Sequence, residues 1–195
     1  MSRTNKVILV AGTRGTGKTD FIKNLLASVS KSFVKSLVVD TFDNPPWRDL
    51  STWDHPERLD TFPVIPLDKF PLWKKGIGRI YSSNTREMMS IIQAHARNTF
   101  IVFEDATRYI GSKITDDVNN FVLDSKQKNL DLVFVFHSLT SIPPDLVRIA
   151  DILVLFKTNE GKISDAKYPW PEIPKAMKEL RQSTNRYAYK VIQLN

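Results

Sequence analysis

Short apolar runs alternate with longer stretches of mixed polarity along this chain of 195 residues. Each of five such runs is four to six residues long, rich in Val, Ile, Leu and Phe, and almost free of apolar–polar alternation. Strands buried on both faces of a parallel sheet have this pattern. The predicted strands are Lys6–Ala11, Ser36–Asp40, Thr99–Glu104, Leu132–His137 and Ile152–Phe156.

Helical spacing of apolar residues appears between these runs. The clearest case is Thr85–Arg97, where Asn84 or Thr85 is the expected N-cap and Glu87 reaches back to it. Strands that alternate with helices predict an α/β fold, with a doubly wound, mostly parallel five-stranded core between two helical layers and right-handed crossovers. The other predicted helices are Thr19–Ser30 and Asp116–Lys128.

We expect residues 1–195 to form a single domain. Two regions of it do not follow the alternation of strands and helices. Residues 42–76 contain six of the eleven prolines and three of the four tryptophans, which predicts an insertion or lid; the alternative is a surface loop that its tryptophans pack down. Residues 157–195 form a basic extension with a short helix ending near Arg181 and a final edge strand within Arg186–Leu194.

The amino-acid composition indicates the cellular compartment and the kind of binding partner to expect. The chain has no cysteine, no signal-peptide layout and no apolar run near the roughly 20 residues that span a bilayer, so we expect a soluble, cytoplasmic protein. Its net charge of +7 indicates a polyanionic partner such as nucleic acid. Residues 157–195 hold eight basic against four acidic residues, which accounts for +4 of this charge.

The first predicted strand leads into a phosphate-binding motif, G-x-x-x-x-G-K-[ST], which opens the first predicted helix. Its glycines allow backbone N–H groups to wrap a phosphate, and the helix N-terminus adds positive potential. Lys18 is placed to reach the β- and γ-phosphates, and the Thr19 hydroxyl to bind Mg²⁺. We therefore expect ATP and Mg²⁺ here. The expected nucleotide contacts are Gly12, Thr13, Arg14, Gly15, Thr16, Gly17, Lys18, Thr19 and Asp20.

Two consecutive acids, Glu104 and Asp105, end the third predicted strand. Carboxylates at the tip of a buried strand are costly unless they serve an ion or substrate. By position, Glu104 is predicted to hold the metal and Asp105 to polarise the attacking water; the alternative is a solvated acidic turn. His137 and Ser138 end the next strand, where they could sense the γ-phosphate or only cap the strand.

In this order, these elements resemble the additional-strand P-loop ATPases, and among them the HerA/FtsK superfamily of DNA-translocating and genome-packaging motors. "SLVVDTFDNPPW", "FIVFEDATRYI" and "DSKQKNLDLVFVFHSLTSIPPDLVRIADILVLFKT" resemble the family's second strand, its acidic strand and the stretch through its polar-tipped strand. Two features depart from the family pattern: Glu-Asp replaces Asp-Glu, and His-Ser stands where a Gln-containing tip is usual.

The resemblance implies an extra strand between the phosphate-loop strand and the acidic strand. It also implies a homo-oligomeric ring, often a hexamer, that acts on DNA in the host cytoplasm or virion, with a capsid or portal-type partner. The short chain favours the packaging ATPases of viruses and mobile elements. In such rings an arginine of one subunit enters the next subunit's site. The candidates, in order of preference, are Arg108, Arg97, Arg148 and Arg14.

Two other functions remain open from the sequence. A nucleotide or small-molecule kinase would share the phosphate loop and the sheet, with residues 42–76 available for the acceptor. That segment, however, holds few basic residues, and kinases do not need the doubled acid. A nucleotide-dependent assembly switch would bind ATP tightly and turn it over slowly. A motor differs from both by forming rings and by being stimulated by DNA.

Overall fold

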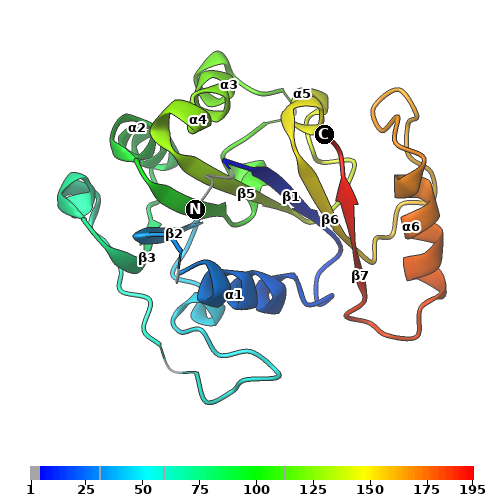
Figure 1. Ribbon diagram of the computed structural model, residues 1–195, viewed down its shortest axis with the longest axis horizontal. Helices are drawn as coiled ribbons and strands as arrows, with labels where there is room; N and C mark the ends of the chain where they lie inside the picture. Colours follow the sequence, from blue (N-terminus) through cyan, green and yellow to red (C-terminus); the bar gives the residue numbers. More distant parts are fainter. Residues whose placement is uncertain (1–4, 31, 59, 112) are drawn as a thin grey trace.

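A twisted sheet with helices on both faces organises the molecule (Figure 1). The computed structural model describes residues 5–30, 32–58, 60–111 and 113–195, and within these it forms seven strands in the order β3-β2-β4-β5-β1-β6-β7. All neighbours pair in parallel except β6 and β7, which are antiparallel. The strands are β1 (Val7–Ala11), β2 (Lys35–Asp40), β3 (Gly76–Tyr81), β4 (Thr99–Phe103), β5 (Leu130–Phe136), β6 (Ile152–Phe156) and β7 (Tyr189–Gln193).

The predicted fold class is confirmed, with a larger strand number than the expected core of five. All five predicted strands form, and the expected C-terminal edge strand is β7. As the resemblance implied, β5 lies between β1 and β4. Strand β3 was not predicted, because Gly76, Gly78 and Arg79 interrupt its apolar pattern. Arg79 is nonetheless buried, and its guanidinium pairs with Asp43 at 2.5 Å.

The predicted helices form within two residues of the expected bounds, although the third is divided at Asp124. Asn84 caps its helix as expected: its Oδ1 accepts from the Glu87 N–H at 3.2 Å, and its amide donates to the Glu87 carboxylate at 3.0 Å. The helices are α1 (Lys18–Val29), α2 (Thr85–His95), α3 (Asp116–Leu123), α4 (Ser125–Lys128), α5 (Pro144–Ile149) and α6 (Glu172–Gln182).

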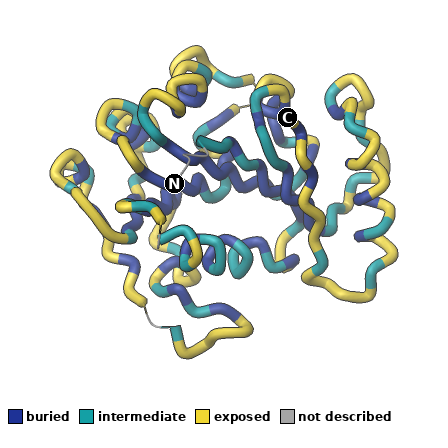
Figure 2. Tube along the Cα trace, in the orientation of Figure 1, coloured by how far each residue is buried: buried dark blue, intermediate teal, exposed yellow. Residues whose placement is uncertain are grey.

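Two apolar cores lie on the two faces of the sheet. The central strands are buried along most of their length, as Figure 2 shows. Successive residues of a strand point to opposite faces, so Leu9 enters one core and Val10 the other. The core on the α1 face contains Ile22 and Leu26, whereas α2, α3, α5 and α6 line the other core. Because both faces are covered, the strands have no polar side, which explains their unbroken apolar runs.

The segment 42–76 joins both cores by passing around the β3 edge of the sheet. Trp47, Leu50 and Phe62 pack into the core on the α1 face, and Ile65 and Phe70 into the opposite core. Near the change from one core to the other, two backbone hydrogen bonds join the segment to Arg79 of β3. The Ile65 N–H donates to the Arg79 carbonyl at 2.8 Å, and the Arg79 N–H donates to the Pro63 carbonyl at 3.0 Å. It therefore covers an edge strand that would otherwise offer unpaired backbone groups. The segment also contains the 3₁₀-helices η1 (Pro45–Trp47) and η2 (Leu67–Leu72).

The C-terminal region adds α6 and β7 at the other edge of the sheet (Figure 1). Ile173 and Leu180 of α6 are buried in the core, and the Trp170 indole N–H donates to the Leu194 carbonyl at 2.8 Å. The loop between α6 and β7 returns to the sheet beside the start of α1 and carries Arg186 and Tyr187 to that end. In the part of the chain that the structure describes, no helix is both long and apolar enough to cross a bilayer.

Candidate nucleotide-binding site

The phosphate-binding motif forms the turn between β1 and α1 at the carboxyl edge of the sheet. The Gly12 N–H donates to the Phe136 carbonyl of β5 at 3.3 Å, and the Thr13 N–H donates to the Lys157 carbonyl, just after β6, at 2.9 Å. Within the loop, the Thr16 hydroxyl donates to the Thr13 carbonyl at 2.8 Å. Backbone hydrogen bonds to the ends of β5 and β6 thus fix the start of the loop, and the hydrogen bond between Thr16 and Thr13 stabilises its turn.

Three positions in the loop require glycine. Gly15 and Gly17 have φ of +72° and +88°, in the left-handed region that side chains disfavour, and Gly17 is the N-cap of α1. At Gly12, a Cβ would lie 2.5 Å from the Phe156 Cβ, so any side chain there would push the loop away from β6. The sequence pattern of the motif therefore corresponds to backbone geometry that only glycine permits without strain.

Lys18 lies folded over this loop. Its side chain is nearly buried, and its ammonium donates to the carbonyls of Gly12 at 2.7 Å and Thr13 at 2.8 Å. Burial lowers the pKa of Lys18, and the nearby carboxylate of Glu104 opposes that shift. A poorly solvated cation held only by carbonyl oxygens is well placed to bind an anion, such as a phosphate, at the same point.

Glu104 follows β4 directly and is aimed at the same pocket. Its backbone N–H donates to the Val39 carbonyl at 3.0 Å, which extends the pairing of β4 with β2. Its Oε2 is buried and has no hydrogen-bond partner among the described residues. Burial raises the pKa of Glu104 to about 7; Lys18 opposes this, and the carboxylates of Asp40 and Asp105 add to it. An unpartnered buried carboxylate oxygen fits a site that is completed by a cation.

Asp105 adopts a left-handed backbone conformation, with φ +47° and ψ +56°, and starts the 3₁₀-helix η3 (Ala106–Arg108). Its carboxylate accepts from the Thr107 hydroxyl at 2.7 Å and from the Arg108 Nε at 3.1 Å. The Arg108 guanidinium also lies 4.6 Å from the centre of the Phe42 ring. Asp105 therefore sits at the rim of the pocket in an ion pair, whereas Glu104 lines the pocket itself.

His137 follows β5 and faces Asp105, with 3.8 Å between the His137 Nε2 and the Asp105 Oδ1. Burial and the charge of Lys18 lower the pKa of His137, while Asp105 opposes the shift, so the imidazole is neutral at pH 7. Its Nδ1 is buried without a partner in the described chain. Ser138, by contrast, stabilises a turn: its hydroxyl accepts from the Ser141 N–H and contacts the Thr140 hydroxyl, both at 3.1 Å.

A pocket of about 370 Å³ opens above the phosphate loop. Its volume lies in the range of small-molecule sites. Three of its lining residues were not anticipated as site residues: Trp53 from segment 42–76, and Arg186 and Tyr187 from the loop between α6 and β7. A Cβ added to Gly15 would overlap the Arg186 guanidinium, so this cation lies directly over the loop. The lining residues are Arg14, Gly15, Gly17, Lys18, Thr19, Asp20, Trp53, Glu104, His137, Arg186 and Tyr187.

The four arginines that were candidates to enter a neighbouring subunit's site occupy different parts of the molecule. Arg14 lines the pocket, and Arg108 is paired with Asp105 at its rim. Arg148 lies exposed on α5, where its guanidinium donates to Asp145 at 2.9 Å. Arg97 precedes β4 and lines a separate cleft at the amino edge of the sheet, away from the phosphate loop. Among the described residues no group of three or more His, Cys, Asp or Glu is arranged to hold a metal by itself.

Solved structures of very different sequence share this fold. The genome packaging NTPase B204 from Sulfolobus turreted icosahedral virus 2, in complex with ATP-gammaS, aligns with a TM-score of 0.73 at 13% identity, over 97% of this chain and 92% of that chain. B204, the DNA-packaging ATPase from Sulfolobus Turreted Icosahedral Virus, aligns with a TM-score of 0.72 at 12% identity, over 99% of this chain and 94% of that chain.

The N-terminal domain of zonular occludens toxin from Neisseria meningitidis aligns more loosely, with a TM-score of 0.50 at 12% identity, over 79% of this chain and 78% of that chain. No protein-family model and no curated protein matches the sequence. The expected resemblance to P-loop ATPases is therefore confirmed at the level of the fold. It extends over nearly the whole chain, including the C-terminal α6 and β7.

Proposed function

We propose that this chain is the ATP-hydrolysing subunit of a motor that translocates or packages DNA for a virus or a mobile element. One observation carries the proposal: the phosphate loop, Lys18, Glu104 and His137 line one pocket at the carboxyl edge of the sheet. Ligands of open α/β sheets bind at this edge. The shared fold with B204, described as a genome-packaging NTPase, supports the same interpretation.

The backbone N–H groups of the loop and the basic side chains beside it would bind the phosphates. Backbone N–H groups at the start of α1 would cradle the phosphates, with Arg14 and Arg186 beside them in the pocket. Lys18 would exchange its two carbonyl contacts for β- and γ-phosphate oxygens, which relieves the cost of a poorly solvated ammonium. In this arrangement the phosphates are held by backbone geometry, and the two arginines add positive charge.

Thr19 and Glu104 are the residues that would hold Mg²⁺. Both line the pocket, and Glu104 offers a buried oxygen that lacks a partner in the described chain. Mg²⁺ is commonly bound by only one or two protein groups together with substrate phosphates, so this small donor set fits the ion. When bound, the ion would neutralise charge on the phosphate oxygens.

The 3.8 Å between the Asp105 carboxylate and the His137 imidazole supports a shared role in water activation. We assign Asp105 as the group that accepts the proton of the attacking water, and His137 as a neutral imidazole that orients the water or senses the γ-phosphate. The Asp105 carboxylate is engaged by the Arg108 guanidinium at 3.1 Å, so this ion pair has to loosen before the carboxylate can contact a water molecule. If a neighbouring subunit or the γ-phosphate attracted Arg108 in a ring, Asp105 would be released. Ser138 would support His137 by holding the following turn.

A basic cleft supports DNA as the partner. Lys35, Lys74 and Arg97 line a cleft of about 1030 Å³ at the amino edge of the sheet. Burial lowers the pKa of Lys35, and the charges of Lys74 and Arg97 lower it further, so these three cations repel one another. Nucleic-acid phosphates would relieve that repulsion. DNA passing through a ring would then contact the edge of the sheet opposite the nucleotide.

The test is steady-state ATP hydrolysis by the purified protein, with and without single- and double-stranded DNA, with Lys18→Ala as the blank. We expect hydrolysis that DNA stimulates and that the Lys18 variant loses. Tight ATP binding without hydrolysis under any condition would contradict the motor and favour a kinase or an assembly switch.

Paired charge reversals test where DNA binds. Lys35→Glu with Lys74→Glu should weaken DNA binding and lower DNA stimulation without changing the DNA-independent rate. Lys175→Glu with Lys178→Glu on α6 makes the same change in net charge and is the matched control. Loss of stimulation in the α6 pair alone would place DNA on the C-terminal extension and contradict the role of the cleft.

A further inference from the structure

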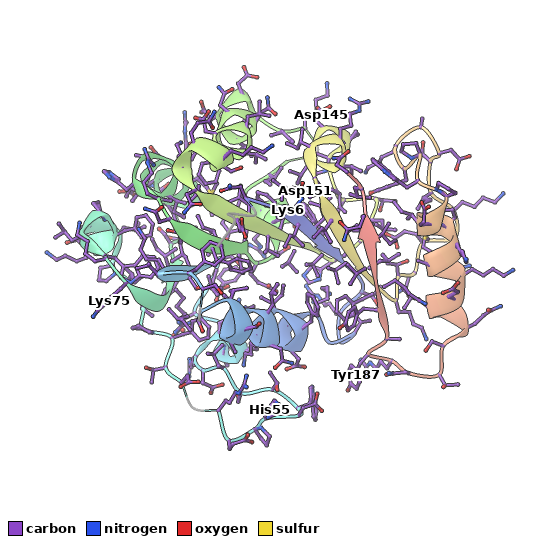
Figure 3. All side chains as sticks on the ribbon, in the orientation of Figure 1. Lys6, His55, Lys75, Asp145, Asp151 and Tyr187 are labelled. Carbon is purple, nitrogen blue, oxygen red and sulfur yellow. The ribbon has the colours of Figure 1, made fainter. Side chains whose placement is uncertain are left out.

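Two exposed aromatic side chains face each other beside the phosphate loop. Trp53 is 76% exposed and Tyr187 is 46% exposed, yet their ring centres lie only 6.4 Å apart with 35° between the planes. Trp53 belongs to the segment that wraps around β3, and Tyr187 to the loop between α6 and β7, labelled in Figure 3. Neither ring contributes to the two apolar cores. Their large exposed surfaces therefore need an explanation other than packing.

Both rings are anchored to the nucleotide-binding motif. The Tyr187 ring lies against the backbone of Gly17, where a Cβ would be 3.1 Å from its Cδ1. The Trp53 side chain lies near the carboxylate of Asp20, in the first turn of α1, and both residues line the same two pockets. The two rings thus lie beside the start of α1, although they come from two segments that are far apart in the chain.

The rings also mark the boundary between two pockets. Gly17, Asp20, Trp53 and Tyr187 line the pocket over the phosphate loop and, equally, an adjoining pocket of about 460 Å³ on the side of α1. That second pocket is mostly aromatic and apolar, with Asn24 among its few polar residues. A molecule with phosphates on the loop would extend from the first pocket into the second past this pair of rings.

We propose that Trp53 and Tyr187 form a clamp that binds the base of the nucleotide between their rings. A flat ring stacks at roughly 3.5 Å from its neighbour, so a base between two rings needs about 7 Å. The ring centres are 6.4 Å apart and the planes are inclined by 35°, so the rings must separate and become more nearly parallel to admit a base. Both residues lie outside helices and strands, so this rearrangement requires no change in regular structure.

A stacking clamp predicts weak discrimination among bases. Every nucleobase has an aromatic face, and stacking on aromatic side chains is correspondingly tolerant of base identity. The polar side chains that line the second pocket are the carboxyl groups of Asp20 and Asp54 and the amide of Asn24, which can both donate and accept. The affinities for ATP, GTP and CTP should therefore lie within about tenfold of one another.

This inference rests on the proposed nucleotide-binding function, so its test separates the base from the phosphates. The probes are ATP-γ-S with Mg²⁺ and inorganic tripolyphosphate with Mg²⁺, with affinities measured by calorimetry or by competition. Trp53→Ala and Tyr187→Ala should each weaken ATP-γ-S binding by roughly 5- to 150-fold, and leave tripolyphosphate affinity within about twofold. The conservative variants Trp53→Phe and Tyr187→Phe should retain most of the nucleotide affinity.

Control variants distinguish the ways in which the idea could fail. Trp73→Ala removes a tryptophan of the same segment at the opposite edge of the sheet and should leave both affinities unchanged. If Lys18→Ala weakens both probes while the two ring variants weaken neither, the clamp is wrong and the nucleotide site stands. Equal loss of both probes in the ring variants would show that the rings only support the loop and would overturn the clamp. If Lys18→Ala changed neither probe, the proposed function itself would be wrong.

Discussion

Glu104→Gln provides a quantitative test of the site, because this change removes an ionisable group and preserves its size. In the folded protein, burial raises the pKa of Glu104 to about 7 even though Lys18 opposes the shift. In the unfolded chain the same carboxyl titrates near its ordinary value of 4.5. The folded state therefore binds this proton more tightly, and stability falls as the pH rises between these two values. Glutamine has no proton to lose, so it escapes that cost.

The size of the effect follows from the two pKa values. The difference between 4.5 and about 7 corresponds to roughly 3 kcal/mol of unfolding free energy lost once the carboxyl is ionised in both states. The variant should thus be more stable than the parent by about 3 kcal/mol at pH 8, and by less than about 1 kcal/mol at pH 5. For a protein of this size, the difference at pH 8 is a rise in Tm of roughly 6 to 12 °C.

The assay is urea-induced unfolding of both proteins at pH 5, 6, 7 and 8, without nucleotide or metal. Glu172→Gln, which makes the same chemical change at an exposed position on α6, serves as the control. A stability difference between parent and Glu104→Gln that is the same at every pH would refute the reasoning, because it would mean that burial does not perturb the carboxyl. Saturating Mg²⁺ with ATP-γ-S should reduce the pH dependence of the parent, since a bound cation favours the ionised form.

Three further predictions concern the loop, the rim and the insertion. Asp105→Asn should keep nucleotide affinity but lose turnover in steady-state assays, because Asn tolerates the left-handed backbone but cannot accept the proton; equal loss of binding would show that the roles of the two acids are misassigned. Gly12→Ala should lower stability by about 1 to 3 kcal/mol, since its Cβ would meet Phe156, and should weaken nucleotide binding in calorimetry. Trp47→Ala should cost roughly 3 to 5 kcal/mol in urea unfolding, and a cost below about 1 kcal/mol would mean that segment 42–76 is not part of the core.

The amino-acid sequence is most informative where the functional motif also requires a particular backbone geometry. The phosphate loop was recognisable because its backbone conformation requires the glycines of the motif. Gly15 and Gly17 adopt positive φ, and Gly12 has no room for a side chain. The buried strands were equally clear, since both faces of the sheet are covered and a polar residue on either face would be costly. The roles assigned to Glu104, Asp105 and His137 remain predictions, although the structure does bring these three side chains to one end of the sheet.

Other features carried no local signal. The edge strand β3 was missed because its glycines and Arg79 lack an apolar pattern. It forms because it pairs with β2 and because Arg79 forms an ion pair with Asp43, in the segment that follows β2. The ion pair between Asp105 and Arg108 likewise depends on the left-handed turn after β4.

The amino-acid sequence by itself determined the layered α/β architecture, the phosphate loop and the acids that follow it, because each depends on neighbours within a few residues or on uniform burial. Only the tertiary structure decided that Trp53, Arg186 and Tyr187 border the same pocket. Trp53 and Tyr187 lie in segments that no periodic pattern links, and they meet because one segment wraps around β3 while β7 pairs with β6 at the far edge. Contacts of this kind depend on the packing of the whole chain and leave no trace in any short stretch of it.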